Sequence, residues 1–347
     1  MPAGQINIGI NGPGMIGRDL VRMFFDFPEF GGKINAINYH AFHPDRIAYL
    51  TKYCSIYGPW YEKEVHENDK GLTIEGEQIN LYAEEEAENI PWDKQDTQIV
   101  IDSSRVYNDP ENAKAHFKNS NVKNVIISSS PIKNECPIIV FGVNHTSLDP
   151  TQEKILSAAT CSSNCLVSTV SVLDKAFGTE SLYALTTHSQ TGENEIYDRL
   201  REGTEGRSIS DNVLPAMTGA TKTFFKVMPH LKDQLGDRVA IKANRVPVTT
   251  GSVFDLNVKV KKSVSVQNVI EAFREAEASN LKGTLAVTID PITVVDIKGI
   301  RHASVIATPY IEVLDNGTVI QLKAFYDNIR GFNSQIGRLV KYISSAA

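Results

Sequence analysis

Cys161 has the surroundings that most clearly predict chemistry in this sequence. It lies in the segment SAATCSSNCLVSTV, immediately before a predicted helix start, with Ser162 and Ser163 in the capping region. Backbone amides and the dipole at a helix N-terminus stabilise a thiolate, so the segment predicts a nucleophilic cysteine. Cys165 follows one turn later, where a small buried hydrophobe is the favoured role.

His188 is the candidate partner for this thiol. A thiolate nucleophile needs a base or an ion-pair partner, and His188 stands at the end of an apolar run, in the polar break THSQTGEN. A lone histidine after a strand is more often structural. From the residues alone, both roles remain open.

A glycine-rich turn near the N-terminus predicts a nucleotide site. The pattern GxGxxG follows a predicted strand directly and opens a predicted helix. Glycine permits a tight turn and a close approach of the backbone to a pyrophosphate, whose charge then faces the helix N-terminus. A glycine-rich turn without a ligand is the alternative. The predicted cofactor contacts in this turn are Gly12, Gly14, Met15, Ile16 and Gly17.

The end of the second strand bears on cofactor choice. A domain that prefers NAD usually ends this strand in Asp or Glu, which binds the ribose hydroxyls, whereas KINAINY ends in Tyr39. The missing carboxylate also removes the repulsion that would exclude a 2′-phosphate. NADP or relaxed choice is therefore plausible, with His40, His43 and Arg46 as candidate contacts, and an exposed polar loop is the alternative for these three.

Two kinds of pattern predict an α/β chain with two domains. Up to Val143, the β-branched runs QINIGI, KINAINY, TQIVIDS and NVIISSS alternate with helical segments such as Ile16–Phe25 and Pro110–Asn119, which is typical of a Rossmann-type doubly wound parallel sheet. After a helix over 161–177, the strands SLYALTTHS, RVAIKANRVPV, SVFDLNVKVKK, ASVIATPYIEVL and TVIQLKAFYD, with a helix over 266–278, predict an α+β domain with a mostly antiparallel sheet.

The domain boundaries follow from these patterns. We predict a dinucleotide-binding domain over 1–160, completed by a C-terminal helix over 328–347, and a catalytic domain over 161–327. Apolar residues at helical spacing near the C-terminus predict that this helix packs on the first domain.

Composition excludes several classes of partner. The 347 residues carry a net charge of −6, which gives no general attraction to nucleic acid or to an anionic membrane. Four unevenly spaced cysteines indicate neither a disulfide framework nor a metal cluster. No segment reads as a signal peptide or membrane span, so we expect a cytoplasmic protein.

The ordered series of motifs resembles the phosphorylating glyceraldehyde-3-phosphate dehydrogenase family. The segments that carry the resemblance span almost the whole chain in the family's order: SAATCSSNCL, THSQT, LPAMTGATKTFFKVMPHL, NRVPV and FYDNIRGF. The resemblance implies a reversible oxidation of glyceraldehyde 3-phosphate to 1,3-bisphosphoglycerate, with hydride transfer to NAD(P) and inorganic phosphate as the second substrate. It also implies a homotetramer.

The resemblance assigns roles to individual residues. Cys161 would attack the aldehyde, His188 would act as base, and Asn328 would hold the cofactor carboxamide. The implied phosphate contacts are Thr191 and Arg245 for the substrate, Thr160, Ser162, Thr218 and Gly219 for the attacking phosphate, and Arg207 between the two sites. A plain turn at Thr218-Gly219 and a solvated surface charge at Arg207 are the alternatives.

Most departures from the family pattern surround the cofactor. They include Pro13 and Met15, Tyr39 in place of an aspartate, Ser104-Arg105 in place of Thr-Gly, Arg199-Leu200 in place of Leu-Pro, and Ile329-Arg330 beside Asn328. Ser104 is nevertheless a predicted cofactor contact. The chemistry residues are kept, so we predict an active enzyme that uses NAD or NADP, with a lean towards NADP or dual use.

Two other functions remain open. A sister enzyme could act on another aldehyde phosphate, such as erythrose 4-phosphate, although the TGA motif at 218–220 favours the phosphorylating reaction on the three-carbon substrate. A catalytically weak homologue could act as a binding or scaffold protein. Retention of Cys161, His188, Arg207 and Arg245 together speaks against the scaffold.

Overall fold

The computed structural model describes residues 5–118, 120–133, 136–216 and 218–346, and the chain divides into two compact units. The first comprises Met1–Ile139, His145–Ala159 and Asn333–Ala347, and the second comprises Val140–Asn144 and Thr160–Phe332. Cofactor binding by the first part of the chain and catalysis by the second remain predictions from the sequence.

A mostly parallel sheet organises the first unit. Its strand order is β10-β9-β8-β1-β2-β7-β6-β5, with parallel pairing from β10 to β7 and antiparallel pairing of β7, β6 and β5. The apolar runs of β1 and β8 are buried on both faces, as helix-covered parallel strands require. The strands are β1 (Ile6–Asn11), β2 (Gly32–Asn38), β5 (Val65–Asn68), β6 (Gly71–Ile74), β7 (Glu77–Tyr82), β8 (Ile99–Asp102), β9 (Asn124–Ile127) and β10 (Ile155–Ser157), while β3 (Tyr53–Cys54) and β4 (Gly58–Pro59) pair separately.

The helices of the first unit include the end of the chain. In α8, the Asn333 side-chain amide donates to the Ile16 carbonyl at 3.1 Å and to the Asp19 carboxylate at 2.9 Å. These bonds join α8 to α1. The α-helices are α1 (Met15–Asp26), α2 (Pro44–Lys52), α3 (Pro110–Ala113) and α8 (Arg330–Ala346), the last counted with this unit from residue 333; the short 3-10 turns are η1 (Pro28–Phe30), η2 (Ala87–Asn89), η3 (Trp92–Gln95), η4 (Lys114–Phe117) and η5 (His145–Ser147).

A mostly antiparallel sheet organises the second unit. Its order is β12-β13-β11-β14-β18-β16-β15, and β17 pairs with β18. Only the pairs β11–β13 and β15–β16 are parallel among the described strands of this sheet. The strands are β11 (Thr179–Ser189), β12 (Leu214–Ala216), β13 (Val239–Val246), β14 (Ser252–Val260), β15 (Leu285–Thr288), β16 (Ser304–Ala307), β17 (Glu312–Leu314) and β18 (Val319–Tyr326).

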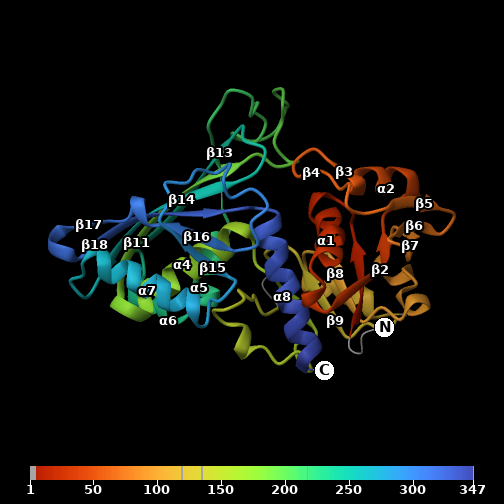
Figure 1. Cartoon of the computed structure of the whole chain (residues 1–347), viewed down its shortest axis with the longest axis horizontal. Helices are drawn as coiled ribbons and strands as arrows, with labels where there is room; N and C mark the ends of the chain where they lie inside the picture. Colours follow the sequence, from red (N-terminus) through yellow and green to blue (C-terminus); the bar gives the residue numbers. More distant parts are fainter. Residues whose placement is uncertain (1–4, 119, 134–135, 217, 347) are drawn as a thin grey trace. The chain divides into compact units, whose positions relative to one another are not determined.

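Helices cover one face of this second sheet. Figure 1 shows α4, α5 and α7 together below β11, β14 and β16. The apolar side of α4 is fully buried at Leu166, Val170 and Leu173, so this helix is held rigidly against the sheet. The remaining elements are α4 (Cys161–Phe177), α5 (Ala220–Val227), α6 (His230–Leu235), α7 (Val266–Ala278), η6 (Thr308–Tyr310) and η7 (Asp315–Gly317).

The predicted fold class is confirmed, with local differences. The helix expected over Pro110–Asn119 is one turn of α3 followed by the 3-10 turn η4, and residue 119 lies outside the described residues. The strand expected through ASVIATPYIEVL is divided into β16 and β17 by η6, which contains Pro309, because proline cannot donate to a strand ladder. In the part of the chain that the structure describes, no helix has both the length and the hydrophobicity to cross a membrane.

Candidate active site

Cys161 is the first residue of α4, and the local sequence fixes that helix start. Thr160 is the N-cap, and its Oγ1 accepts a hydrogen bond from the Ser163 amide at 3.1 Å. A side chain that accepts from N3 satisfies one of the free amides of the first turn. Ala159, directly before the cap, has a left-handed φ of +62°, a conformation that non-glycine residues hold only under tertiary constraint.

His188 lies at the end of β11 and faces the thiol. Its Nε2 is 3.3 Å from Cys161 Sγ, and the histidine is only 5% exposed. The parallel register of β11 and β13 places Arg245 opposite His188. The structure therefore brings Cys161, His188 and Arg245 together.

The second ring nitrogen of His188 has two competing neighbours. The Ser189 carbonyl, which can only accept, lies 2.7 Å from Nδ1, and Nη1 of Arg245, which can only donate, lies 2.5 Å from it. Nη1 also reaches the Ser189 carbonyl at 3.3 Å. When Nη1 donates to both atoms, Nδ1 is an acceptor, so the ring proton lies on Nε2 and faces Sγ.

Burial opposes a charge on either member of the pair alone. It raises the pKa of Cys161 to about 11, against the opposite effect of Arg245 and of the Ser162 and Cys161 amides. Burial, reinforced by Arg245, lowers the pKa of His188 to about 3. The amides at the start of α4 do lower the pKa of Cys161, as the sequence predicts, but the desolvation of the thiol raises it by more. Once Arg245 no longer donates to Nδ1, Nε2 can take the proton from Sγ, which places two opposite charges 3.3 Å apart that compensate each other.

Asn328 is held so that its amide nitrogen is available as a donor. Its Oδ1 accepts from Ser189 Oγ at 2.9 Å, from Thr250 Oγ1 at 3.0 Å and from the Gly251 amide at 3.1 Å. Three donors on the oxygen fix the orientation of the amide, and Nδ2 has no partner among the described residues. The sequence offers no signal for Ser189 and Thr250, because β11, the Thr250 turn and the end of β18 meet only in the folded unit.

Two further buried side chains adjoin the thiol region. The hydroxyls of Tyr326 and Thr186 lie 2.7 Å apart, and the Tyr326 ring packs 5.9 Å from the His188 ring. Burial raises the pKa of Tyr326 well above its ordinary value. Cys165 is fully buried against Ser304 and Ala324, as expected for a packing residue, and burial raises its pKa to about 12.

In the described part of the chain, the other predicted phosphate contacts do not form one hydrogen-bonded group as Cys161, His188 and Arg245 do. Thr160 Oγ1 lies 3.1 Å from Ser162 Oγ, whereas Thr191 bonds Asn194 and Arg207 pairs with Asp198 at 3.2 Å on an exposed segment. Thr218 Oγ1 accepts from the Ala220 amide, and Gly219 is the N-cap of α5. Among the described residues, no hydrogen bond or ion pair joins Thr191, Arg207 or Thr218 to Cys161 or His188.

The glycine turn of the first unit has the shape that a dinucleotide needs. Gly12 has a φ of +93°, and a Cβ there would lie 2.7 Å from Ser104 Cα. A Cβ on Gly17 would lie 2.4 Å from the Gly12 carbonyl oxygen, whereas nothing lies within 4 Å of one on Gly14. In a dinucleotide site the first glycine allows a tight turn, the second lets the backbone approach the pyrophosphate, and the third lets the helix pack closely on the strand. Gly12, Gly14 and Gly17 match these three roles in that order. The turn therefore fits a dinucleotide.

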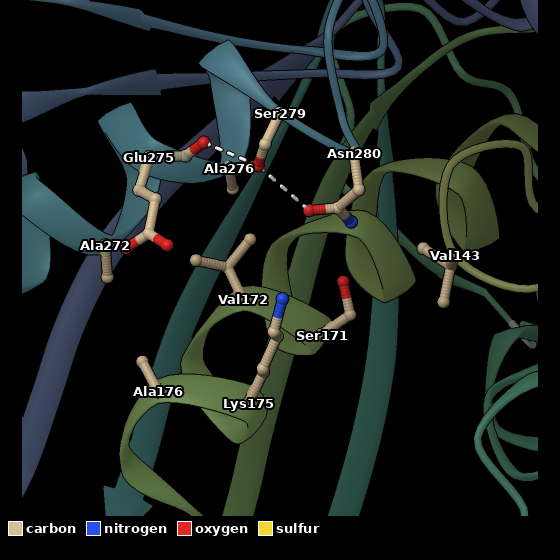
Figure 2. A pocket seen from close by; sticks show the side chains of 10 residues that line it. All are labelled: Val143, Ser171, Val172, Lys175, Ala176, Ala272, Glu275, Ala276, Ser279 and Asn280. Atoms are coloured by element: carbon tan, nitrogen blue, oxygen red, sulfur yellow. Dashed lines mark hydrogen bonds between the residues drawn. The ribbon is translucent and has the colours of Figure 1, made fainter.

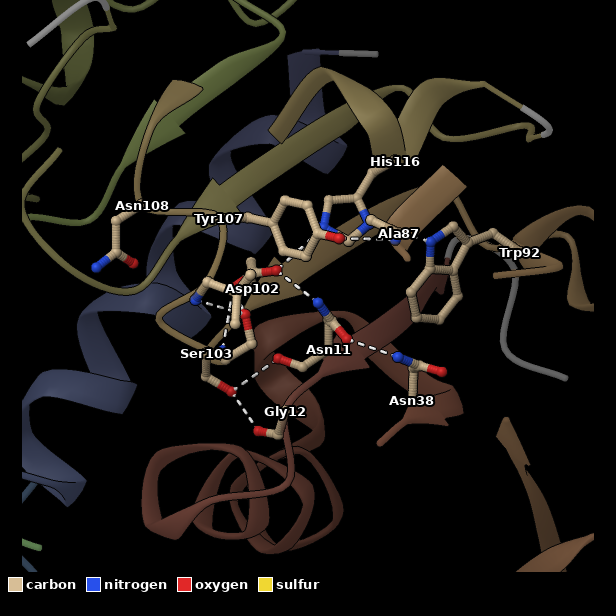
Figure 3. A network of polar contacts seen from close by, with 12 residues as sticks. Asn11, Gly12, Asn38, Ala87, Trp92, Asp102, Ser103, Tyr107, Asn108 and His116 are labelled. Carbon is tan, nitrogen blue, oxygen red and sulfur yellow. Dashed lines mark hydrogen bonds and ion pairs between the residues drawn. The ribbon is translucent and has the colours of Figure 1, made fainter. Parts of the chain in front are cut away.

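Other predicted cofactor contacts surround this turn. Met15 and Ile16 begin α1 and are half-buried. Tyr39 is half-buried and its ring packs 4.0 Å from that of His40. Arg105, beside Ser104, has a left-handed φ of +67°. Figure 3 shows Asn11, Asn38, Asp102 and His116 in one polar chain beneath this region, which the sequence does not predict.

A surface groove of about 350 Å³ lies between α4 and α7, away from the thiol. Figure 2 shows Lys175 and Glu275 on its two sides. Its lining includes neither Cys161 nor His188, so it is not the predicted active site. Across the described ranges, no group of three or more His, Cys, Asp or Glu residues could hold a metal ion.

The first unit defines a protein with a dinucleotide-binding type of α/β fold, and the second adds a cysteine–histidine pair, Cys161 with the buried His188. Residues 6–110 match the family described as "Glyceraldehyde 3-phosphate dehydrogenase, NAD binding domain", and residues 160–328 match its "C-terminal domain". The chain belongs to the glyceraldehyde-3-phosphate dehydrogenase family.

Curated relatives cover the chain almost completely. It is 33% identical over 345 residues to "Glyceraldehyde-3-phosphate dehydrogenase 1" of Saccharomyces cerevisiae, covering 99% of this chain and 100% of the relative. It is 34% identical to the "Glyceraldehyde-3-phosphate dehydrogenase" of Borreliella burgdorferi, over 95% of this chain and 97% of that protein. A "cytosolic" relative from Chlamydomonas reinhardtii is 31% identical over 99% and 98% of the two chains.

Proposed function

We propose that this chain is an NAD(P)-dependent, phosphorylating glyceraldehyde-3-phosphate dehydrogenase. The observation that carries the proposal is the triplet of Cys161, His188 and Arg245, with His188 Nε2 3.3 Å from Cys161 Sγ and Arg245 against Nδ1. A thiol, a base and a cation in one place suit covalent catalysis on an anionic aldehyde. Family membership supports the same reaction.

Cys161 is the proposed nucleophile. Its Sγ attacks the aldehyde carbon while the thiol proton passes to the carbonyl oxygen, which gives a thiohemiacetal. Loss of a hydride from that carbon, for which a bound nicotinamide would be the acceptor, and of the hydroxyl proton to His188 leaves a thioester on Cys161. Inorganic phosphate then attacks the thioester and releases the acyl phosphate and the thiol. His188 returns the proton to the departing sulfur, so the pair ends as it began.

Arg245 couples recognition of the substrate phosphate to the base. While Nη1 donates to Nδ1, the lone pair of His188 does not face the substrate. A substrate phosphate that draws Arg245 away lets Nδ1 carry the proton and donate to the Ser189 carbonyl, 2.7 Å distant. Nε2 is then free to accept the proton of the hydroxyl group on the reacting carbon.

The remaining phosphate contacts are proposed from the family. Thr191 would join Arg245 on the substrate phosphate, while Thr160, Ser162, Thr218 and Gly219 would bind the attacking phosphate, with Arg207 between them. Thr160 supports its role because it is the N-cap of α4 and its Oγ1 lies 3.1 Å from Ser162 Oγ. Helix N-termini bind phosphate well.

A nicotinamide cofactor, when bound, supplies the hydride acceptor. The glycine turn and Ser104 would hold its pyrophosphate region, and the Nδ2 donor of Asn328 suits its carboxamide oxygen. NAD is the cofactor in the description of the matching domain. We infer that NADP is also accepted, since Tyr39 supplies no carboxylate against a 2′-phosphate. Arg199, which stands in place of the leucine of the Leu-Pro pair, could contact a 2′-phosphate, but its ion pair with Glu195 at 3.0 Å weakens this support.

The proposal for the cellular setting rests on the family resemblance and on the net charge of −6. We propose a homotetramer in the cytoplasm that meets no nucleic acid or membrane, with an aldehyde phosphate and inorganic phosphate as its small-molecule substrates. Comparison of kcat/KM for glyceraldehyde 3-phosphate and erythrose 4-phosphate distinguishes the sister enzyme from this proposal.

Trapping the covalent intermediate tests the proposal. With glyceraldehyde 3-phosphate and oxidised cofactor but no phosphate, intact-mass analysis should find an acyl group on the protein, and peptide mapping should place it on Cys161. Cys165→Ser is the matched control, four residues along the same helix, and should still be acylated. Acylation of the Cys161→Ser protein would contradict the proposed nucleophile.

A further inference from the structure

A buried polar chain joins the carboxyl ends of three parallel strands in the first unit. Asn38 at the end of β2 donates from Nδ2 to Asn11 Oδ1 at 2.8 Å, and Asn11 at the end of β1 donates to Asp102 Oδ2 at 2.7 Å. His116 Nε2 lies 3.0 Å from the same carboxylate oxygen. All four side chains are at most 4% exposed. Figure 3 shows this network from close by.

The direction of each hydrogen bond in this chain is fixed from its two ends. At one end, the backbone amide of Glu84 donates to Asn38 Oδ1 and its carbonyl accepts from Nδ2. This orients Asn38 and hence Asn11. At the other end, Trp92 Nε1, which can only donate, points at His116 Nδ1 from 3.3 Å. The proton of the neutral His116 ring therefore lies on Nε2 and points at Asp102.

Asp102 consequently accepts hydrogen bonds from both sides of the network, from Asn11 and from His116. Its Oδ2 receives Asn11 and His116, and its Oδ1 receives the amide and hydroxyl of Ser104 at 3.0 and 2.8 Å. An ionised carboxylate suits four donors, whereas a protonated acid would lose one of these acceptor positions. The site is thus a buried anion held by hydrogen bonds rather than by a cation.

This network of buried polar side chains lies directly under the loops that surround the predicted cofactor site. Asn11 precedes Gly12, Asn38 precedes Tyr39, and Asp102 precedes the turn that contains Ser104. Ser103 Oγ locks that turn to the glycine turn, since it donates to the Gly12 carbonyl at 2.6 Å. Displacement of Asp102 would therefore reach each of these loops through a direct bond or the adjoining residue.

We propose that Asp102 and His116 are positioning residues for the dinucleotide, which hold the glycine turn, the Tyr39 strand end and the Ser104 turn in one geometry. His116 acts through Asp102 and touches no substrate or cofactor. The inference rests on the cofactor-binding role of the first unit within the proposed function. It adds that cofactor affinity depends on a residue buried beneath the site.

Paired substitutions at His116 test the proposal. Gln offers one donor and one acceptor and replaces both imidazole functions, whereas Leu keeps volume and offers neither. By isothermal titration calorimetry, His116→Leu should weaken binding of NAD and of NADP about tenfold or more, the scale of one hydrogen bond to a charged group. His116→Gln should recover most of that loss. The rate of Cys161 alkylation should remain that of wild type in both.

Separate outcomes overturn separate claims. A His116→Leu protein with a lowered Tm but unchanged Kd for both nucleotides would show a purely structural role and overturn the inference. If that variant does not fold, Asp102→Asn gives the same test from the other partner, and an unchanged Kd there overturns it equally. A wild-type protein with affinity for neither nucleotide would overturn the proposed cofactor function as well.

Discussion

The proton shared by Cys161 and His188 predicts how stability depends on pH. With His188 titrating near 3 and Cys161 near 11, the folded pair holds one exchangeable proton across the range between them. This count is the same for a neutral thiol–imidazole pair and for a thiolate–imidazolium pair. The unfolded chain differs, because a free histidine with a pKa of 6.5 gains a proton as the solution becomes acidic.

The sign and size follow from linkage. The folded pKa of His188 lies below the unfolded value, so its contribution to stability is present above pH 6.5 and is lost as pH falls towards 3. Between pH 7.5 and pH 5, the loss amounts to about 2 kcal/mol for a shift of this size. His188→Asn removes the titrating group, and its free energy of unfolding should therefore fall by about 2 kcal/mol less than that of wild type over the same interval.

Urea unfolding at pH 7.5 and pH 5, at one protein concentration, measures the free energy of unfolding of wild type and of His188→Asn. His66→Asn is the matched control, because His66 is exposed on β5, and it should follow wild type at both pH values. A wild-type to His188→Asn difference that does not change with pH would refute the reasoning about the buried pair.

Three further predictions concern the thiol, its helix and the cofactor. His188→Asn should slow iodoacetamide alkylation of Cys161 at pH 7 by at least tenfold, because burial raises the pKa of this thiol to about 11 and the variant loses the neighbour that can take its proton; an unchanged rate would count against the pairing. Thr160→Ala should lower the free energy of urea unfolding by about 1 kcal/mol through loss of the Ser163 cap bond, and Thr160→Ser should retain it; equal losses would exclude capping by Oγ1. Tyr39→Asp should raise the ratio of the NADP to the NAD Kd about tenfold or more, because like charges repel; an unchanged calorimetric ratio would mean that the residue at this position does not meet the ribose.

Local patterns predicted the elements that carry the candidate site. The helix over 161–177 and the glycine turn were predictable because capping residues, glycines and apolar spacing act over a few positions. The resemblance to the family then predicted roles for His188, Arg245 and Asn328 from short segments. In these cases the neighbours along the chain, or a matching motif, carry the signal.

Tertiary placement decided what the sequence could not predict. Arg245 and His188 are 57 residues apart in the sequence, and Arg245 meets Nδ1 of His188 only through the parallel register of β11 and β13. The helix terminus at Cys161 argued for an easily ionised thiol, but burial by residues distant in sequence raises its pKa to about 11. The chain from Trp92 through His116 to Asp102 likewise joins separate segments, and none of the three stands in a recognisable pattern.

The central claim is phosphate-dependent oxidation of an aldehyde phosphate through Cys161. The most direct measurement follows the reduction of NAD and of NADP in parallel with glyceraldehyde 3-phosphate, with and without inorganic phosphate, for wild type and Cys161→Ser. Sustained turnover that requires phosphate and disappears in the variant is the predicted result. Reduction that continues without phosphate, or no reduction of either nucleotide by a protein whose Cys161 still reacts with iodoacetamide, would contradict it.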